Sequence, residues 1–354
     1  MDKRWFGTSA GNADKTTSSK SCSYLSNQES CQKHCRGNVL SEIVGQDEAV
    51  NCLRRVVDGS LRKPLLLVGD EGVGRKASAL AAIREIVSAA RGGPDSPAVV
   101  QVERGVHPDV IVVAPPPDKE MDVDSVREVV ASAQQHPVAS PCRFFILDGA
   151  DRMTSAAANA VLKTLEEPPE FSRFFLLAES FERVIPTIRS RCGRVDYRIL
   201  PESFVFERVS QFERNRDKAL VYARLGEGSI GRATRFWGSN RIVVRDKCVE
   251  ILRQGLAGDL PAAFSILDEF SKDLPIVLRM LVFVTHDLLV LPSAPNRIVN
   301  VDIQEDLSDM YARFGKDTLA NLWRALRTAW VRYESVHVNL PLQVKAALMA
   351  AFIG

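Results

Sequence analysis

The part of the sequence best suited to bind a ligand is the glycine-rich segment 69–76, GDEGVGRK. Gly69 and Gly74 keep the separation of the Gly-x4-Gly-Lys-Ser/Thr phosphate loop, and Gly72 lies between them. Glycines let successive backbone N–H groups turn toward phosphate oxygens, and the positive end of a following helix also attracts anions. The segment therefore predicts an anion-binding loop between a strand and a helix.

The two positions after Gly74 depart from this pattern. Arg75 stands where a lysine normally reaches the outer phosphates, and its planar guanidinium does not replace a compact ammonium. Lys76 stands where a hydroxyl would hold Mg²⁺, while Asp70 and Glu71 add negative charge to the loop. We therefore expect ATP to bind weakly or not at all.

A second element of a nucleotide site follows the apolar run at 143–147. Asp148 comes directly after this run, where a carboxylate helps to hold Mg²⁺ through water. Gly149 comes next, at the position where an ATPase of this type has a glutamate that polarises the attacking water. Hydrolysis by this chain is therefore expected to be very slow or absent.

The elements around these residues alternate between two kinds of pattern. Apolar runs typical of buried strands lie at 64–69, 109–113, 143–147 and 173–178, and helical patterns lie between them at 77–90, 123–135 and 155–165. Strands that are apolar throughout are covered on both faces, so this order predicts a doubly wound, mostly parallel α/β sheet. After Tyr197 the strand signals fade and helical patterns take over.

These patterns divide the chain into an N-terminal extension, an α/β domain, a small helical lid and a C-terminal helical domain. The predicted ranges are 1–38, 39–200, 201–240 and 241–354. The extension is rich in Ser, Lys, Asn and Thr, which is typical of a flexible segment. It contains Cys22, Cys31 and Cys35, with His34 beside the last. Adjacent His34 and Cys35 are poorly placed to bind one ion together, so no zinc is expected.

Composition excludes few function classes. Lys and Arg total 46 against 44 Asp and Glu, so the net charge of +2 gives no overall signal for nucleic acid, and any DNA contact must come from a local patch. No stretch reaches the ~18 uninterrupted apolar residues of a membrane span, and the first residues are not followed by an apolar signal core. We expect no membrane contact and a cytoplasmic location.

Three later segments strongly resemble bacterial clamp-loader subunits of the AAA+ class. They are ILDGADRMT at 146–154, ANAVLKTLEEPP at 158–169 and IPTIRSRC at 185–192. VGQ at 44–46, HPD at 107–109, GSIGRA at 228–233 and NLPL at 339–342 are similar too. The resemblance extends over about 39–354. It implies a P-loop AAA+ sheet, a lid at 201–240 and an all-helical collar at 241–354 that joins an oligomer.

The same resemblance implies roles for individual residues. In this family, the arginine of the Ser-Arg-Cys motif reaches into the ATP site of a neighbouring subunit, and Arg191 matches it, with Arg189 as the alternative. Lys163 and Arg152 are candidates for contact with the DNA backbone. The implied partners are the other clamp-loader subunits, a sliding clamp and primer–template DNA.

The sequence also departs from this family in two places. Gly231 stands where catalytic subunits have a nucleotide-sensing arginine, with Arg232 after it, and no cysteine lies between Cys52 and Cys142 to form the family's four-cysteine zinc module. The leading interpretation is a non-hydrolysing subunit that supplies Arg191 to a neighbour. One alternative is an active ATPase that uses Arg75 and Lys76 unconventionally. Another is a DNA-polymerising enzyme, for which the sequence shows no suitable set of metal-binding carboxylates.

Overall fold

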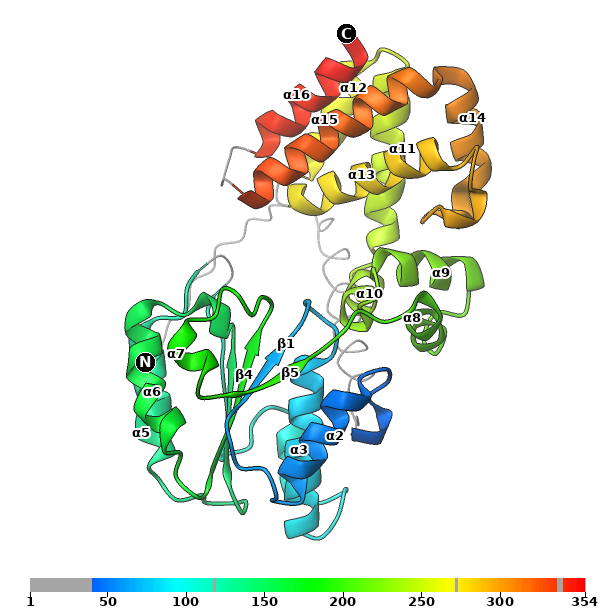
Figure 1. Cartoon of the computed structure of the whole chain (residues 1–354). Helices are drawn as coiled ribbons and strands as arrows, with labels where there is room; N and C mark the ends of the chain where they lie inside the picture. The colour runs from blue at the N-terminus through cyan, green and yellow to red at the C-terminus, as the bar shows by residue number, and fades with distance from the viewer. Residues whose placement is uncertain (1–39, 117–118, 271–272, 336–339, 354) are drawn as a thin grey trace, which may run out of the picture.

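The computed structural model describes residues 40–353 except 117–118, 271–272 and 336–339. The predicted extension at 1–38, and the cysteines in it, therefore lie outside the described residues. In the described part, an α/β domain is followed by a run of helices (Figure 1). None of the helices in these residues is long and apolar enough to cross a membrane.

A parallel sheet of five strands forms the centre of the α/β domain within the described residues. Its strands are β1 (Leu65–Val68), β2 (Val110–Val113), β3 (Arg143–Asp148), β4 (Ser172–Ala178) and β5 (Gly193–Asp196), in the order β2-β3-β4-β1-β5. Leu65 pairs with Phe175 on one side and with Gly193 on the other. Because the strands are parallel, their carboxyl ends share one edge, which places the loops after β1 and β3 on the same side of the domain.

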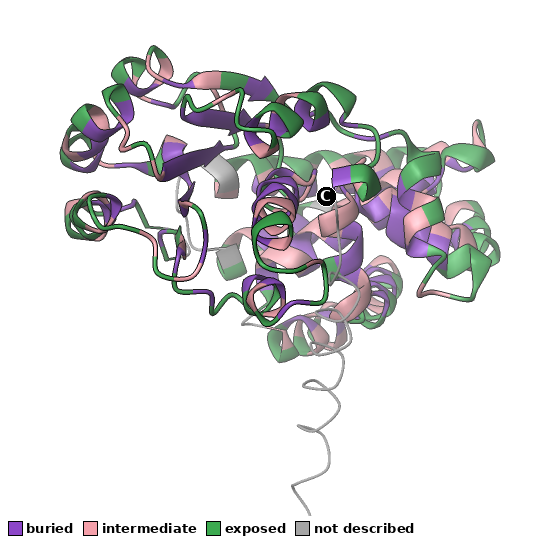
Figure 2. Ribbon diagram, turned by 90° about the horizontal axis from the view of Figure 1, so that it is seen from below, coloured by how far each residue is buried: buried purple, intermediate pink, exposed green. Residues whose placement is uncertain are grey.

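Helices cover both faces of this sheet, as the sequence predicted. Figure 1 shows α2 (Asp47–Val57) and α3 (Arg75–Ala90) on one face, and α5 (Val123–Ala133) and α6 (Ser155–Glu166) on the other. Alternate residues of each strand face opposite sides, so β3 sends Phe144 and Ile146 into one apolar cluster and Phe145 and Leu147 into the other. The three central strands β1, β3 and β4 are accordingly buried between the helices, whereas the edge strands β2 and β5 are more exposed (Figure 2).

Among the described residues of this domain, the short elements β5, α4 (Pro97–Glu103) and α7 (Pro186–Arg189) were not predicted, nor were the 3₁₀ turns at Leu40–Glu42 and Ala150–Arg152. The strand β5 has the sequence GRVD and only Val195 in it is buried, because β5 is an edge strand with a largely exposed surface. Such a strand carries no continuous apolar run, and its backbone pairing with β1 supplies the stability that its side chains do not.

The remaining helices follow β5. They are α8 (Glu202–Val209), α9 (Arg216–Leu225), α10 (Ile230–Gly238), α11 (Arg241–Leu256), α12 (Leu260–Glu269), α13 (Leu274–Val290), α14 (Gln304–Phe314), α15 (Lys316–Ser335) and α16 (Leu340–Ile353). One apolar cluster runs from Leu200, just before α8, to Leu348 in α16. The predicted lid boundaries at 200/201 and 240/241 fall just before α8 and just before α11.

A buried polar network ties the lid helix α9 to the C-terminal helices through the loop after α13. Arg245 is 1% exposed and donates to both carboxylate oxygens of Asp302, at 2.7 and 2.8 Å. Asp287, also buried, accepts from the backbone N–H of Asn300 at 2.7 Å. Arg224 of α9 donates to the carbonyl oxygen of Asn296 in the same loop at 2.9 Å. The lid and the C-terminal helices are thus joined by hydrogen bonds as well as by apolar packing.

Candidate functional site

The predicted phosphate loop lies between β1 and α3, at the carboxyl edge of the sheet. Gly72 and Gly74 have φ values of 78° and 109°, a backbone region that side chains other than glycine rarely adopt. Gly69 donates its N–H to the carbonyl oxygen of Ala178 at 3.1 Å, which ties the start of the loop to β4. The loop therefore lies between a strand and a helix, as expected, and its glycines hold backbone conformations that other residues rarely adopt.

The lid lies directly against this loop. The N–H of Gly231, in the first turn of α10, donates to the carbonyl oxygen of Gly72 at 2.9 Å, and the Ser229 hydroxyl donates to that of Glu71 at 2.9 Å. A Cβ atom on Gly231 would lie 2.8 Å from the Cα of Gly72, and one on Gly72 would lie 2.4 Å from the Ser229 hydroxyl oxygen. The backbones at Gly72 and Gly231 therefore lie so close together that both positions require glycine.

The cationic side chains of the loop are engaged by carboxylates of this same chain. Lys76 places its ammonium 3.4 Å from a carboxylate oxygen of Asp148, so that an ammonium lies beside the carboxylate that would help to hold Mg²⁺. The Arg75 side chain is 9% exposed and its guanidinium lies 3.9 Å from Glu179. In this arrangement the residues do not fit a magnesium–nucleotide complex, because neither cation is directed into a free phosphate site.

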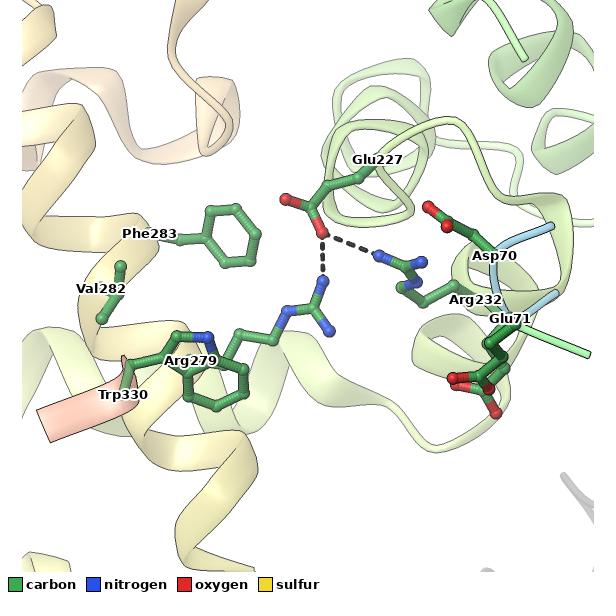
Figure 3. Close-up of a pocket in the computed structure, with 9 residues that line it drawn as sticks. Asp70, Glu71, Glu227, Arg232, Arg279, Val282, Phe283 and Trp330 are labelled. Atoms are coloured by element: carbon green, nitrogen blue, oxygen red, sulfur yellow. Dashed lines mark hydrogen bonds and ion pairs between the residues drawn. The ribbon is translucent and has the colours of Figure 1, made fainter. Parts of the chain in front are cut away.

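A cavity of about 500 Å³ opens beside the loop, between the α/β domain, the lid and the C-terminal helices (Figure 3). Glu227 pairs in it with both Arg232 and Arg279, and Phe283 and Trp330 form the opposite wall. The full lining is Asp70, Glu71, Glu179, Glu227, Arg232, Arg279, Val282, Phe283 and Trp330. Four carboxylates against two guanidiniums leave this lining negative, which opposes the binding of a polyphosphate.

Arg191 lies in the turn between α7 and β5 and does not line this cavity. Its guanidinium donates from Nη1 to the carbonyl oxygen of Thr187 at 2.9 Å and pairs through Nη2 with Glu166. The next residue, Cys192, is 6% exposed, and burial raises the pKa of its thiol to about 12. A buried Cys192 anchors the turn, while the Arg191 side chain remains 27% exposed at the surface.

The alternative candidate, Arg189, is engaged differently. Its guanidinium lies over the ring of Phe181, 5.0 Å from the ring centroid, and Arg194 lies over the same ring at 4.0 Å. Stacking of this kind uses the flat face of a guanidinium and fixes its direction. Arg189 is therefore directed at an aromatic ring of its own domain, whereas Arg191 presents its edge to a carboxylate.

The predicted DNA contacts, Arg152 and Lys163, are both exposed and lie near opposite ends of α6. Arg152 precedes α6 and Lys163 lies in its last turn, and the helix rises about 1.5 Å per residue, so the stretch from Ser155 to Lys163 alone spans roughly 12 Å. The structure therefore brings the loop residues and Asp148 together but leaves Arg191, Arg152 and Lys163 at separate places.

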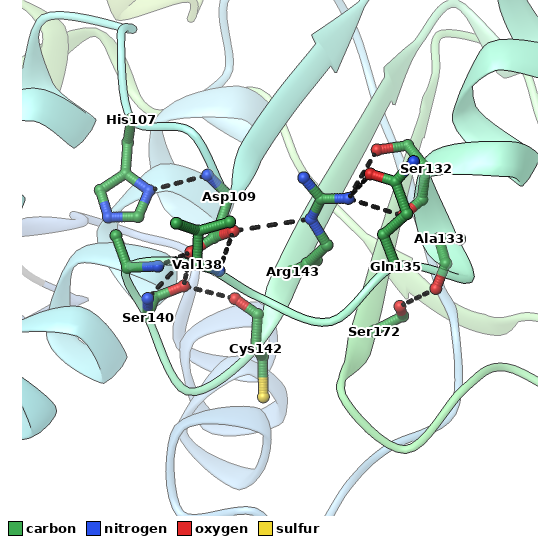
Figure 4. Close-up of polar contacts among 11 residues, drawn as sticks. His107, Asp109, Ser132, Ala133, Gln135, Val138, Ser140, Cys142, Arg143 and Ser172 are labelled. Carbon is green, nitrogen blue, oxygen red and sulfur yellow. Dashed lines mark hydrogen bonds and ion pairs between the residues drawn. The ribbon is translucent and has the colours of Figure 1, made fainter.

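The HPD segment at 107–109 has a structural role. Asp109 is fully buried, and its carboxylate accepts from the backbone N–H groups of Val138, Ala139 and Ser140 at 2.9, 2.6 and 2.8 Å (Figure 4). Burial acts to raise the pKa of Asp109, but these N–H donors outweigh it and hold the pKa below its usual value. The Arg143 guanidinium lies 3.5 Å away, so Asp109 fixes the loop that leads into β3.

Sequence reasoning missed several residues of this site: Glu166, Glu179, the ion pair of Glu227 with Arg279, and the lid residue Ser229 in its contact role. Glu166 and Ser229 both lie in segments whose sequences resemble clamp-loader subunits. Only the fold shows which residues they contact. Glu179 directly follows β4. Its position after a buried strand could have placed it at the carboxyl edge of the sheet, near the phosphate loop.

Residues 45–200 match the protein family described as DNA polymerase III, delta subunit. The chain is 33% identical over 207 residues to DNA polymerase III subunit delta' of Escherichia coli (strain K12), which covers 57% of this chain and 61% of that protein. It is 26% identical over 316 residues to human replication factor C subunit 4, covering 82% and 81%. It is 28% identical over 325 residues to DNA polymerase III subunit gamma/tau of Mycobacterium tuberculosis, covering 79% and 55%. The chain thus spans about three fifths of the Escherichia coli relative.

Proposed function

We propose that this chain, which belongs through residues 45–200 to the DNA polymerase III delta subunit family, is a delta'-type AAA+ subunit of a DNA replication clamp loader. In this role it does not hydrolyse ATP. It supplies Arg191 to the ATP site of a neighbouring subunit while the sliding clamp is placed on primed DNA.

The observation that carries this proposal is the pairing of Lys76 with Asp148. An ammonium of the chain itself takes the place beside Asp148 where an ATPase needs Mg²⁺, and Gly149 supplies no carboxylate to activate water. Further support comes from the lid, whose Gly231 bonds to the loop backbone at Gly72. We infer that nucleotide binds weakly or not at all, and that turnover takes place in partner subunits.

The proposed partners follow from the same assignment. They are the other clamp-loader subunits, the sliding clamp and primer–template DNA, in a cytoplasmic assembly. Arg152 and Lys163 are exposed on the α6 side of the domain and are proposed to contact the DNA backbone. The α15 residues Leu319, Leu322 and Leu326 are fully buried within the chain, so any contact with a collar partner uses other faces of these helices.

The test is a clamp loader reconstituted with this chain, its ATPase partner, the sliding clamp and primed DNA. Arg191→Ala is expected to lower the DNA-stimulated rate of ATP hydrolysis about 10³-fold, because a guanidinium in trans neutralises charge that develops on the transferred phosphate. Arg189→Ala is the matched control and is expected to change the rate less than about threefold. Unchanged hydrolysis with Arg191→Ala would contradict the finger assignment.

A further inference from the structure

We propose that Glu166 is a positioning residue for Arg191, holding the guanidinium in the direction in which it meets the ATP of a neighbour. The inference rests on the proposed role of Arg191. Glu166 is the last residue of α6, and Arg191 lies 25 residues later in the turn before β5, so the pair joins two separate segments of the chain.

The contacts of the Arg191 side chain support this role. Nη1 is fixed by the carbonyl oxygen of Thr187 at 2.9 Å, Nη2 is fixed by Glu166, and Nε is buried without a partner among the described residues. Thr187 belongs to the same short helix-and-turn segment as Arg191, so its bond alone lets the side chain move together with that turn. Glu166 belongs to α6, so its contact is the one that fixes the guanidinium relative to the rest of the domain.

Glu166 belongs to a helix that is held firmly in the domain. The helix α6 begins at a capped end, where the Thr154 hydroxyl accepts from the N–H of Ala157 at 3.1 Å, and Val161 and Leu165 are buried against the sheet. An arginine side chain has many rotamers, and one that must reach across a subunit interface loses their entropy when it binds. A carboxylate on a fixed helix removes part of that freedom before the neighbour arrives.

The pair is not so strong that it withholds Arg191 from a phosphate. Glu166 is 47% exposed and Arg191 27% exposed, so solvent screens their attraction. A guanidinium has five N–H donors in a planar fork; Arg191 directs Nη1 to the Thr187 carbonyl and the Ser190 hydroxyl and Nη2 to Glu166, which leaves one N–H of Nη2 for a further partner. Glu166 therefore orients the group, and a dianionic phosphate at the interface competes well for its outer edge.

Glu167 provides a matched control within the chain. It is the next residue, it carries the same exposed carboxylate, and no contact between it and Arg191 is present among the described residues. Changes at 167 alter the same local charge as changes at 166 but leave the guanidinium held. A comparison of the two positions therefore separates orientation from general electrostatics.

The experiment uses the complete reconstituted clamp loader with primed DNA and measures steady-state ATP hydrolysis over a range of ATP concentrations. Glu166→Ala is expected to lower kcat about tenfold and to leave KM for ATP unchanged within about twofold, since a misplaced finger weakens transition-state contacts but not ground-state binding. Glu166→Gln keeps an oxygen acceptor for Nη2 and is expected to retain at least half of kcat. Glu167→Ala is expected to match the unmodified protein.

Three results would overturn the inference: an unchanged or higher kcat with Glu166→Ala, a Glu166→Gln protein as slow as Glu166→Ala, or an equal loss with Glu167→Ala. Thermal unfolding of each purified variant identifies a loss that comes from misfolding, and Glu166→Gln, which preserves the shape of the side chain, then decides the question. Arg191→Ala in the same assay keeps the two proposals apart. If it has no effect, the finger role fails; if it slows hydrolysis while Glu166→Ala does not, only the positioning role fails.

Discussion

The Lys76 ammonium lies 3.4 Å from a carboxylate oxygen of Asp148, and this pair joins the start of α3 to the end of β3. The two positions at which an ATPase has a hydroxyl and a carboxylate to hold Mg²⁺ carry here an ammonium and a carboxylate that pair with each other. The pair is partly exposed, so its contribution to stability is small, about 0–1 kcal/mol. The pair matters because the ammonium occupies the place beside Asp148 where an ATPase would bind Mg²⁺.

The first prediction concerns nucleotide binding by the purified chain. With 1 mM ATP and Mg²⁺, a dissociation constant of 1 mM or weaker stabilises the fold by at most about 0.4 kcal/mol, so we expect Tm to rise by less than about 2 °C. A thermal shift measurement checks this. A rise of about 5 °C or more would contradict it, and ATP turnover by the chain alone that Asp148→Asn abolishes would favour the active-ATPase alternative.

The second prediction concerns the contact between lid and loop. Gly231→Ala places a Cβ 2.8 Å from the Cα of Gly72, where only a displacement of α10 relieves the clash. We expect a loss of about 1–3 kcal/mol in the free energy of unfolding, with faster protease cleavage between β5 and α8. Gly258→Ala is the control, because a Cβ there meets nothing within 4 Å and only its φ of +90° causes strain. Equal stability and equal cleavage rates in Gly231→Ala and the unmodified protein would show that the lid is not packed on the loop.

The third prediction is a pH dependence at Asp109. Its pKa is held below the unfolded value of about 4, so its stabilising effect is fully present above that pH and is lost as pH falls through the folded pKa. Asp109→Asn turns an N–H₂ group toward N–H donors and is expected to cost about 3 kcal/mol at pH 7. Urea unfolding at pH 7 and pH 3 should show the two proteins converging in acid. A difference that stays constant or grows at low pH would contradict this account.

The fourth prediction concerns DNA. If Lys163 and Arg152 each contact one phosphate, Lys163→Ala and Arg152→Ala should each reduce the slope of log K against log salt for binding of primed DNA by about 1. The measurement is a salt titration of the reconstituted assembly by fluorescence anisotropy. Lys218→Ala removes an exposed lysine of the lid and should leave the slope unchanged. A slope that stays the same in all three variants would remove both residues from the DNA interface.

Much of the α/β domain could be predicted from the sequence because its strands are apolar on both faces. The runs at 109–113, 143–147 and 173–178 match β2, β3 and β4 within one residue at each end, and the helix predicted at 155–165 ends one residue short of α6. The strand β5 escaped prediction because GRVD lies at the edge of the sheet, where burial leaves no pattern.

The candidate site also has a part that the sequence predicted and a part that it did not. The loop from Gly69 to Lys76 is contiguous, so its glycines and its two unusual cations were visible as a motif. The contacts Gly72–Gly231 and Glu166–Arg191 join segments 159 and 25 residues apart, and no spacing in the sequence signals which side chains will meet. Sequence showed which groups had been lost, whereas only the fold shows what replaced them.

The strand β5 links two of these places directly. Arg191 lies two residues before its first residue, and Tyr197, just after its last, donates its N–H to the carbonyl oxygen of Val68 at the base of the phosphate loop. The four residues of β5 between them span about 13 Å. If the chain takes its proposed position in a ring, one neighbour meets the Arg191 end and the other meets the loop and lid. The strand would then fix the distance between the two interfaces of this subunit. A subunit that binds no nucleotide would thereby set the spacing between the neighbouring subunits that hydrolyse ATP.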